Sequence, residues 1–170
     1  MPQSDTLVVE KLEAQFNRAH ISQHDFEEAE EYLNEIQNAP SEVVRRALLT
    51  SAIIAYARPF TQNERASSAP ATSSISNKHL QQLTKEEQVL HERILGLRHE
   101  AIAHSPYALR PLQREGLHER GFVVNGTYFD VLSESVDREV FACMCGRLKL
   151  ACRLQKVELN ERLFRLQNAA

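Results

Sequence analysis

Apolar residues recur every three or four positions over most of the chain, which is the spacing of one face of an α-helix. Side chains that cap helices stand before these runs, and Pro59 and Pro106 follow two of them. The pattern predicts helices over residues 5–18, 22–38, 41–58, 84–105 and 133–167. The starts are marked by Ser4, Ser22, Ser41, Thr84 and Ser133.

Two stretches depart from this helical pattern. Residues 61–77 are rich in Ser, Ala and Thr and carry little that can pack, which predicts a mobile loop. Between residues 121 and 131, apolar residues flank Asn125-Gly126, and this pair favours the tight turn of a β-hairpin. We therefore expect one all-α domain over residues 1–170. Its fold is an up-and-down bundle of four to five helices, with a short β-hairpin before the last helix.

The helix predicted over residues 84–105 has an unusual distribution of charge. Thr84 and Glu87 have the spacing of a capping box, and Arg98 lies inside the apolar arc beside His91. His104 lies at the other edge of the arc, in the last turn. The apolar arc itself consists of Leu90, Ile94, Leu95, Leu97, Ala101 and Ile102.

An arginine in an apolar arc is costly unless it is paired or has a function. One interpretation is structural, with Arg98 pairing with a carboxylate or extending its head to water. The other is an anion site, because guanidinium groups bind phosphate well and His104 would exchange a proton near neutral pH.

Composition and charge narrow the range of possible functions only slightly. The net charge of −3 does not indicate a nucleic-acid-binding protein. Acidic residues concentrate between residues 25 and 35, and basic residues between 147 and 165. The three cysteines, Cys143, Cys145 and Cys152, lie in one apolar helical stretch and are expected to be buried free thiols. With no apolar run that would span a bilayer and no signal segment, we expect a cytoplasmic protein without a membrane partner.

Several catalytic templates do not fit the chain. His99 and His104 resemble the HExxH zinc motif, but their separation of five residues places them about 140° apart on a helix, so no metal site is expected. The chain has no Gly-rich nucleotide motif and no nucleophile elbow, so no cofactor is expected. Tyr107, just after the helix, is an aromatic candidate for stacking on a base.

Residues 97–105, Leu-Arg-His-Glu-Ala-Ile-Ala-His-Ser, resemble the signature of the HEPN superfamily and, within it, an abortive-infection branch. That signature is an Arg, a polar residue, a short helical spacer and a His. Here five residues separate Arg98 from His104, and His99 takes the polar position, where Asn or Asp is commoner. The order of elements is similar too: helices, a long helix that ends in the motif, and a long last helix.

This resemblance implies a metal-independent RNA endonuclease that acts as a toxin or antiviral effector. It implies a homodimer in which two copies of the Arg98/His104 motif meet in one composite cleft. His104 would transfer a proton, Arg98 would hold the phosphate, and His99 would orient the site. His91 and Tyr107 would contact the RNA near Arg98. The resemblance also implies a possible nucleotidyltransferase-type antitoxin as partner.

Two alternatives remain open at this stage. If it is not a ribonuclease, the chain is either a non-catalytic HEPN-like bundle that binds a nucleotide or a protein through the same cleft, or an unrelated helical interaction protein with Arg98 in a structural ion pair. The broad apolar arc around Arg98 also predicts that this helix lies at or near the interface of a two-fold homodimer.

Overall fold

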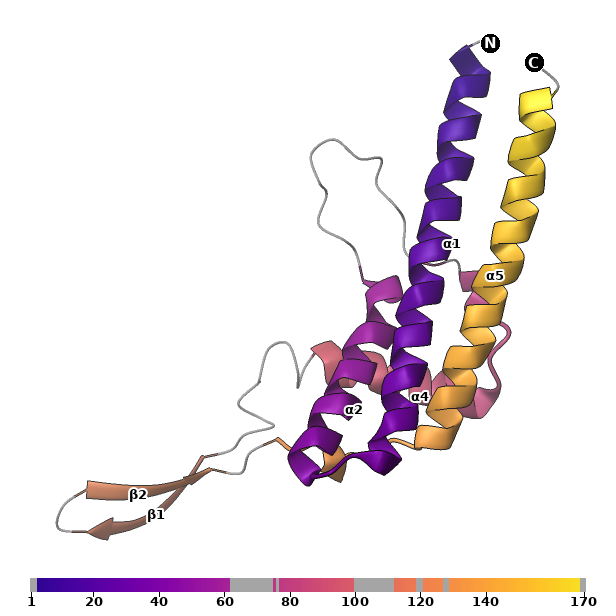
Figure 1. Ribbon diagram of the computed structural model, residues 1–170. Helices are drawn as coiled ribbons and strands as arrows, with labels where there is room; N and C mark the ends of the chain where they lie inside the picture. The colour runs from indigo at the N-terminus through magenta and orange to yellow at the C-terminus, as the bar shows by residue number, and fades with distance from the viewer. Residues whose placement is uncertain are drawn as a thin grey trace.

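Two long helices form the spine of the protein. The computed structural model describes residues 3–61, 75, 77–99, 112–118, 121–126 and 129–168. Helix α1 (Gln3–Glu35) and helix α5 (Arg138–Asn168) lie antiparallel and side by side along much of their length (Figure 1). Helices α2 (Glu42–Ala57), α3 (Asn77–Leu80) and α4 (Lys85–Gly96) pack around the lower part of this pair in the same view. The helical-bundle prediction is therefore confirmed.

Helix α1 is continuous where the sequence predicted two helices. Ser22 was expected to cap a second helix, but it lies inside α1 and its side chain is fully buried. It shares the inward face of α1 with Ala19, Phe26 and Ala29, which are buried as well. Burial of this whole face outweighs the weak preference of serine for a helix start. The predicted break at Ser22 is wrong.

The other helix starts are set by local hydrogen bonds. The Val44 N–H donates to Ser41 Oγ at 3.3 Å, so α2 begins where the sequence predicted. Helix α5 begins later than predicted, because Asp137 Oδ1 accepts from the N–H groups of Glu139 and Val140, each at 3.0 Å. Ser133 belongs instead to a preceding 3₁₀ turn, η5 (Val131–Ser133).

The strand pairing differs from the predicted hairpin. Strand β1 (Leu112–His118) pairs antiparallel with β2 (Gly121–Gly126), and Asn125 and Gly126 lie within β2, opposite Gln113 and Leu112. The hairpin predicted over residues 121–131, with its turn at Asn125-Gly126, is therefore not supported. An Asn-Gly pair favours a turn only locally, and here the preceding segment supplies the partner strand.

The loop predicted over residues 61–77 lies largely outside the described residues. Of its members, Thr61 follows a 3₁₀ turn, η2 (Arg58–Phe60), and Ile75 is buried in the core. The Ile75 N–H donates to the Pro59 carbonyl at 3.0 Å. A backbone hydrogen bond thus joins the turn before the loop to a residue near the end of the loop, while the mobility of the loop stays a prediction.

The core of the bundle is centred on Tyr56. Its ring contacts Phe26, Phe60 and Phe141, with ring centroids 5.6, 5.3 and 5.2 Å apart. These residues come from α1, α2, η2 and α5, so one aromatic cluster holds four segments together. Buried aromatic rings at such separations pack favourably beyond the area they bury.

The cysteine prediction holds for two of the three thiols. Cys145 and Cys152 are buried on the face of α5 that packs into the bundle, whereas Cys143 is exposed. Cys143 is two positions from Cys145, so it projects from a different side of the helix. The expectation that all three are buried is wrong for Cys143.

The acidic stretch of α1 and the basic residues elsewhere in the chain are brought together by folding. Arg58 pairs with Asp25 at 3.2 Å and with Glu28, and Lys149 of α5 pairs with Glu30. The antiparallel packing of α1 against α5 places the acidic stretch of α1 beside the beginning of the basic stretch of α5. The charge asymmetry in the sequence is therefore partly neutralised within the fold.

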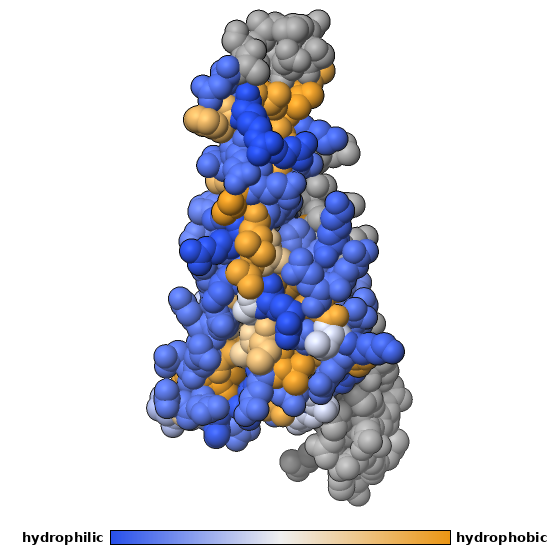
Figure 2. All heavy atoms as spheres, turned by 90° about the vertical axis from the view of Figure 1, so that its right-hand side faces the viewer, coloured by the Kyte–Doolittle hydropathy of each residue, from blue (hydrophilic) through white to orange (hydrophobic). Residues whose placement is uncertain are grey.

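Apolar side chains also gather on the outer face of α5. Leu150, Leu154, Val157 and Phe164 are each more than half exposed. Figure 2 shows an orange band running up the face of the molecule that includes α5. Among the helices that the structure describes, none is both long and apolar enough to cross a membrane.

Candidate functional site

Helix α4 leads into the predicted motif, residues 97–105, and is fixed at its start by a capping box. The Glu87 N–H donates to Thr84 Oγ1 at 3.2 Å, and the Thr84 N–H donates to Glu87 Oε2 at 2.7 Å. Arg147 Nε of α5 donates to Glu87 Oε1 at 3.1 Å. Burial raises the pKa of Glu87, but the bonds from Thr84 and Arg147 outweigh it and hold the pKa below its usual value. The cap predicted from sequence is confirmed, and it also ties α4 to α5.

The apolar face of α4 is used inside the same chain. Leu90, Ile94 and Leu97 are buried in the core. Among residues 85–97, the large apolar side chain that is clearly exposed is Val89, on another side of the helix. Along this part of α4, the broad apolar arc is covered by the bundle itself and leaves no comparable face for a second copy.

His91 is a core residue with a hydrogen-bond partner. It is 4% exposed, and its Nδ1 lies 2.7 Å from the hydroxyl oxygen of Tyr56. Its ring also contacts the Phe60 ring, with centroids 4.7 Å apart. Burial lowers the pKa of His91, which favours the neutral imidazole at pH 7. This environment gives His91 a structural role, so we do not retain it among the proposed RNA contacts.

Arg98 lies just beyond the regular part of α4. Gly96 ends the α-helix, and residues 97–99 continue as a π-type turn. Leu97 is buried, Arg98 is partly exposed and His99 is exposed. No hydrogen bond or ion pair joins Arg98 to another side chain in the described parts of the chain. The arginine therefore stands at the boundary between the core and solvent.

The remaining motif residues are not placed. His104 and Tyr107 lie outside the described residues, so the distance from Arg98 to His104 is not defined. The π-type turn also affects the angular positions that the sequence pattern assigned to the motif residues. Positions assigned at 100° per residue hold only up to the end of the regular helix, and single π-turns are frequent at functional sites.

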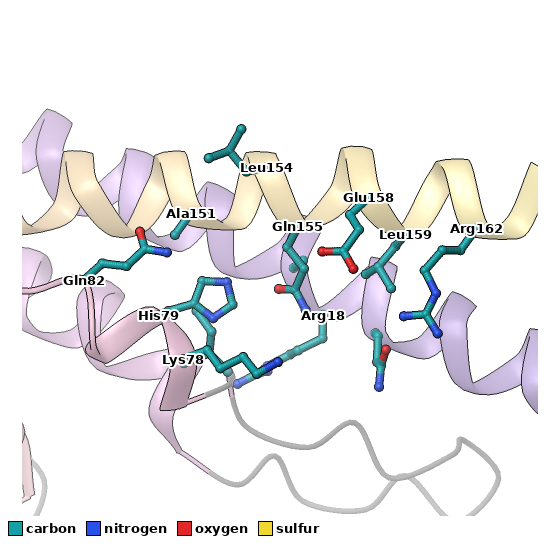
Figure 3. A pocket seen from close by; sticks show the side chains of 13 residues that line it. Arg18, Lys78, His79, Gln82, Ala151, Leu154, Gln155, Glu158, Leu159 and Arg162 are labelled. Atoms are coloured by element: carbon teal, nitrogen blue, oxygen red, sulfur yellow. The ribbon is translucent and has the colours of Figure 1, made fainter.

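A second polar cluster, which the sequence did not single out, lines a cavity between α1, α3 and α5. The cavity has a volume of about 620 Å³. Arg18 of α1 reaches it from a position that is only 6% exposed, and Lys78 and His79 of α3 line it as well. In Figure 3, Gln155, Glu158 and Arg162 extend from α5 toward the cavity, while Leu154 points the other way.

Arg18, like Arg98, is an arginine on the apolar side of a predicted helix. It lies on the inward face of α1, one position before the buried Ala19. The sequence pattern predicted that the first helix ends at Arg18, and an arginine is common at the end of a helix. Only the continuous α1 shows that this guanidinium sits in the middle of a helix and on its buried side.

Comparison with protein families, curated proteins and solved structures found no match to this chain.

Proposed function

We propose that this protein is a metal-independent RNA endonuclease of HEPN type that acts as a toxin or antiviral effector. The observation that carries the proposal is the position of Arg98 at the end of α4, at the signature spacing from His104. The buried residues Leu90, Ile94 and Leu97 anchor α4 on the bundle, and the guanidinium emerges where this anchored face ends. A rigid helix with a partly exposed arginine is a suitable support for a phosphate contact.

The proposed chemistry needs only the RNA and the protein side chains. The 2′-hydroxyl attacks the adjacent phosphorus, so an O2′–P bond forms and the P–O5′ bond breaks. His104 takes the proton of the 2′-hydroxyl, and a second acid returns a proton to O5′. Arg98 binds the phosphate and stabilises the extra negative charge of the transition state. His99, which is exposed beside Arg98, orients the site or lines the cleft.

The second acid is the reason for proposing a homodimer. Two-fold symmetry would bring His104 of another copy to the same phosphate. The described apolar face of α4 is buried within its own chain, so this face does not support the interface. The dimer rests on the resemblance and on the need for two proton-transfer groups. A cytoplasmic location and a nucleotidyltransferase-type antitoxin are parts of the same proposal.

The deciding experiment is RNA cleavage in the presence of EDTA by the wild type and by Arg98→Ala and His104→Ala. Loss of a proton-transfer group should reduce the rate by about 10²–10⁴-fold. Arg153→Ala and His24→Ala are matched controls, because both side chains are exposed on other helices, and they should cleave like the wild type.

The variants must also fold, which far-ultraviolet circular dichroism and thermal melting would establish. Full cleavage by folded His104→Ala would overturn the proposal. Nucleotide binding by the wild type without any RNA cleavage would instead favour the non-catalytic HEPN-like bundle. Light scattering at micromolar concentration would test the dimer, and a monomer that cleaves RNA would exclude the composite cleft.

A further inference from the structure

The cavity between α1, α3 and α5 collects positive charge around a buried guanidinium. Arg18 donates from Nη2 to the carbonyls of Arg58 and Pro59, at 3.2 and 2.6 Å. Its Nε is buried without a hydrogen-bond partner in the described residues. A guanidinium has five N–H donors in a planar fork, and these contacts use only one of its nitrogens. Nη2 therefore holds Arg18 to the backbone, and Nη1, which makes no hydrogen bond in the described residues, is the donor left for the cavity.

The described lining of the cavity holds more positively than negatively charged side chains. Lys78 and Arg162 line it together with Arg18, and the carboxylate described there is that of Glu158. Within the described part of the chain, no ion pair involves Arg162 or Glu158. Two arginines, Arg18 and Arg162, beside one carboxylate in a partly enclosed space attract an anion more strongly than scattered surface charges do.

The rest of the lining is suited to an organic group. Ile75 and Leu159 are buried apolar residues at the wall, and Gln15, Gln82 and Gln155 place carboxamides around it. A carboxamide both donates and accepts hydrogen bonds, so it can read the polar edge of a ring or a sugar hydroxyl. The described lining is therefore mostly polar with a small apolar wall, and its volume is in the range that holds a small organic molecule.

We propose that this cavity binds a small phosphate monoester. The phosphate lies beside Arg18 and Arg162, and the organic part lies against the apolar wall and the glutamines. The described lining residues belong to α1, α3, α5 and the segments beside α3. Because none of them is in the Arg98 motif, this proposal does not rest on the ribonuclease proposal.

The test is isothermal titration calorimetry of the full chain with AMP, inorganic phosphate and adenosine. We expect AMP to bind, inorganic phosphate to bind more weakly, and adenosine to bind least. Arg162→Gln should weaken AMP binding by about tenfold, because it removes a charge-assisted contact. Glu158→Gln removes the opposing carboxylate and should tighten AMP binding by about twofold to fivefold. Arg153→Gln, on the same helix but outside the cavity, should have no effect.

The two variants should change the affinity for AMP in opposite directions, and this is the decisive part of the test. Both side chains are exposed, so neither change should unfold the protein, and unchanged melting temperatures would verify this. No AMP binding at millimolar concentration would overturn the proposal. Equal binding of AMP and adenosine would overturn it too, as would affinities for AMP that neither Arg162→Gln nor Glu158→Gln changes. RNA cleavage assays on the same variants would show whether AMP binding at the cavity is independent of the RNA cleavage proposed for the Arg98 motif.

Discussion

At the scale of single residues, the polar groups inside the bundle fall into two kinds. Tyr56 and His91 are buried as a hydrogen-bonded pair, and Asp25 keeps Arg58 as its partner. Ser22 is buried just as deeply, but its hydroxyl has no partner among the described residues. Paired groups contribute modestly to stability, whereas an unpaired buried hydroxyl is a net cost. These differences lead to two predictions.

Replacement of Ser22 by alanine should leave the fold as stable as before or stabilise it by about 1 kcal/mol. The change removes an unsatisfied hydroxyl and introduces the best helix former. Urea unfolding followed by circular dichroism would measure it. The converse change, Ala29→Ser on the same buried face, should destabilise the protein. A loss of stability in Ser22→Ala would show that the hydroxyl has a partner after all.

Protonation of His91 should weaken the fold below neutral pH. Burial lowers the pKa of His91 in the folded state, while the unfolded side chain titrates near the usual histidine pKa of 6.5. The unfolded state therefore binds more protons, so this contribution is fully present above pH 6.5 and is lost as pH falls toward the lowered pKa. His91→Gln retains an amide that can donate to or accept from the Tyr56 hydroxyl but does not titrate. Its free energy of unfolding should fall less between pH 7 and 5 than that of the wild type, and parallel pH profiles would refute the prediction.

At the scale of secondary-structure elements, helix α4 depends on its first turn. The capping box of Thr84 and Glu87 satisfies two backbone N–H groups, and the link from Glu87 to Arg147 joins α4 to α5. The far end of α4 leads into the π-type turn that presents Arg98. The start of the helix therefore holds in place the element that carries the motif.

Thr84→Ala should lower the free energy of unfolding by about 1 kcal/mol, the usual cost of losing a capping hydroxyl. Thr84→Ser retains the hydroxyl that accepts from the Glu87 N–H, so it should stay close to the wild type. Denaturant unfolding of both variants would measure the difference. Equal stabilities of the alanine and serine variants would mean that the cap contributes nothing to α4.

At the scale of the whole molecule, the packing of α1 against α5 closes the core. These helices come from opposite ends of the chain, and their contact buries Cys145 and Cys152. Burial raises the pKa of both thiols, that of Cys152 to about 12. A buried thiol with a raised pKa is almost entirely protonated and unreactive, because the thiolate is the nucleophile.

Thiol labelling should therefore report on the opening of the α1–α5 pair. In native conditions, Ellman's reagent should modify Cys143 rapidly and the two buried cysteines only on the timescale of opening. All three should react at once in denaturant, and Cys143→Ser should abolish the rapid phase. Rapid modification of more than one thiol in the native wild type would contradict the described packing.

Sequence alone determined the features that depend on neighbouring residues. The Ser41 cap, the capping box at Thr84 and the end of α2 at Pro59 were predicted correctly, because each is a contact within a few positions of the chain. The helical class followed from the periodicity of apolar residues in the same way. Local hydrogen bonds and helix propensities depend on residues that are close in sequence, so the sequence pattern predicts them.

Only the tertiary structure decided the features that depend on distant partners. Ser22 became a core residue because α1 is covered along its length, and β2 paired with the preceding strand although its own Asn-Gly favoured a turn. The cavity around Arg18 exists because α1, α3 and α5 meet there, although no stretch of sequence contains it. The physical reason is that burial on a shared face outweighs local preferences of about 1 kcal/mol per residue, and which faces are shared depends on the whole chain.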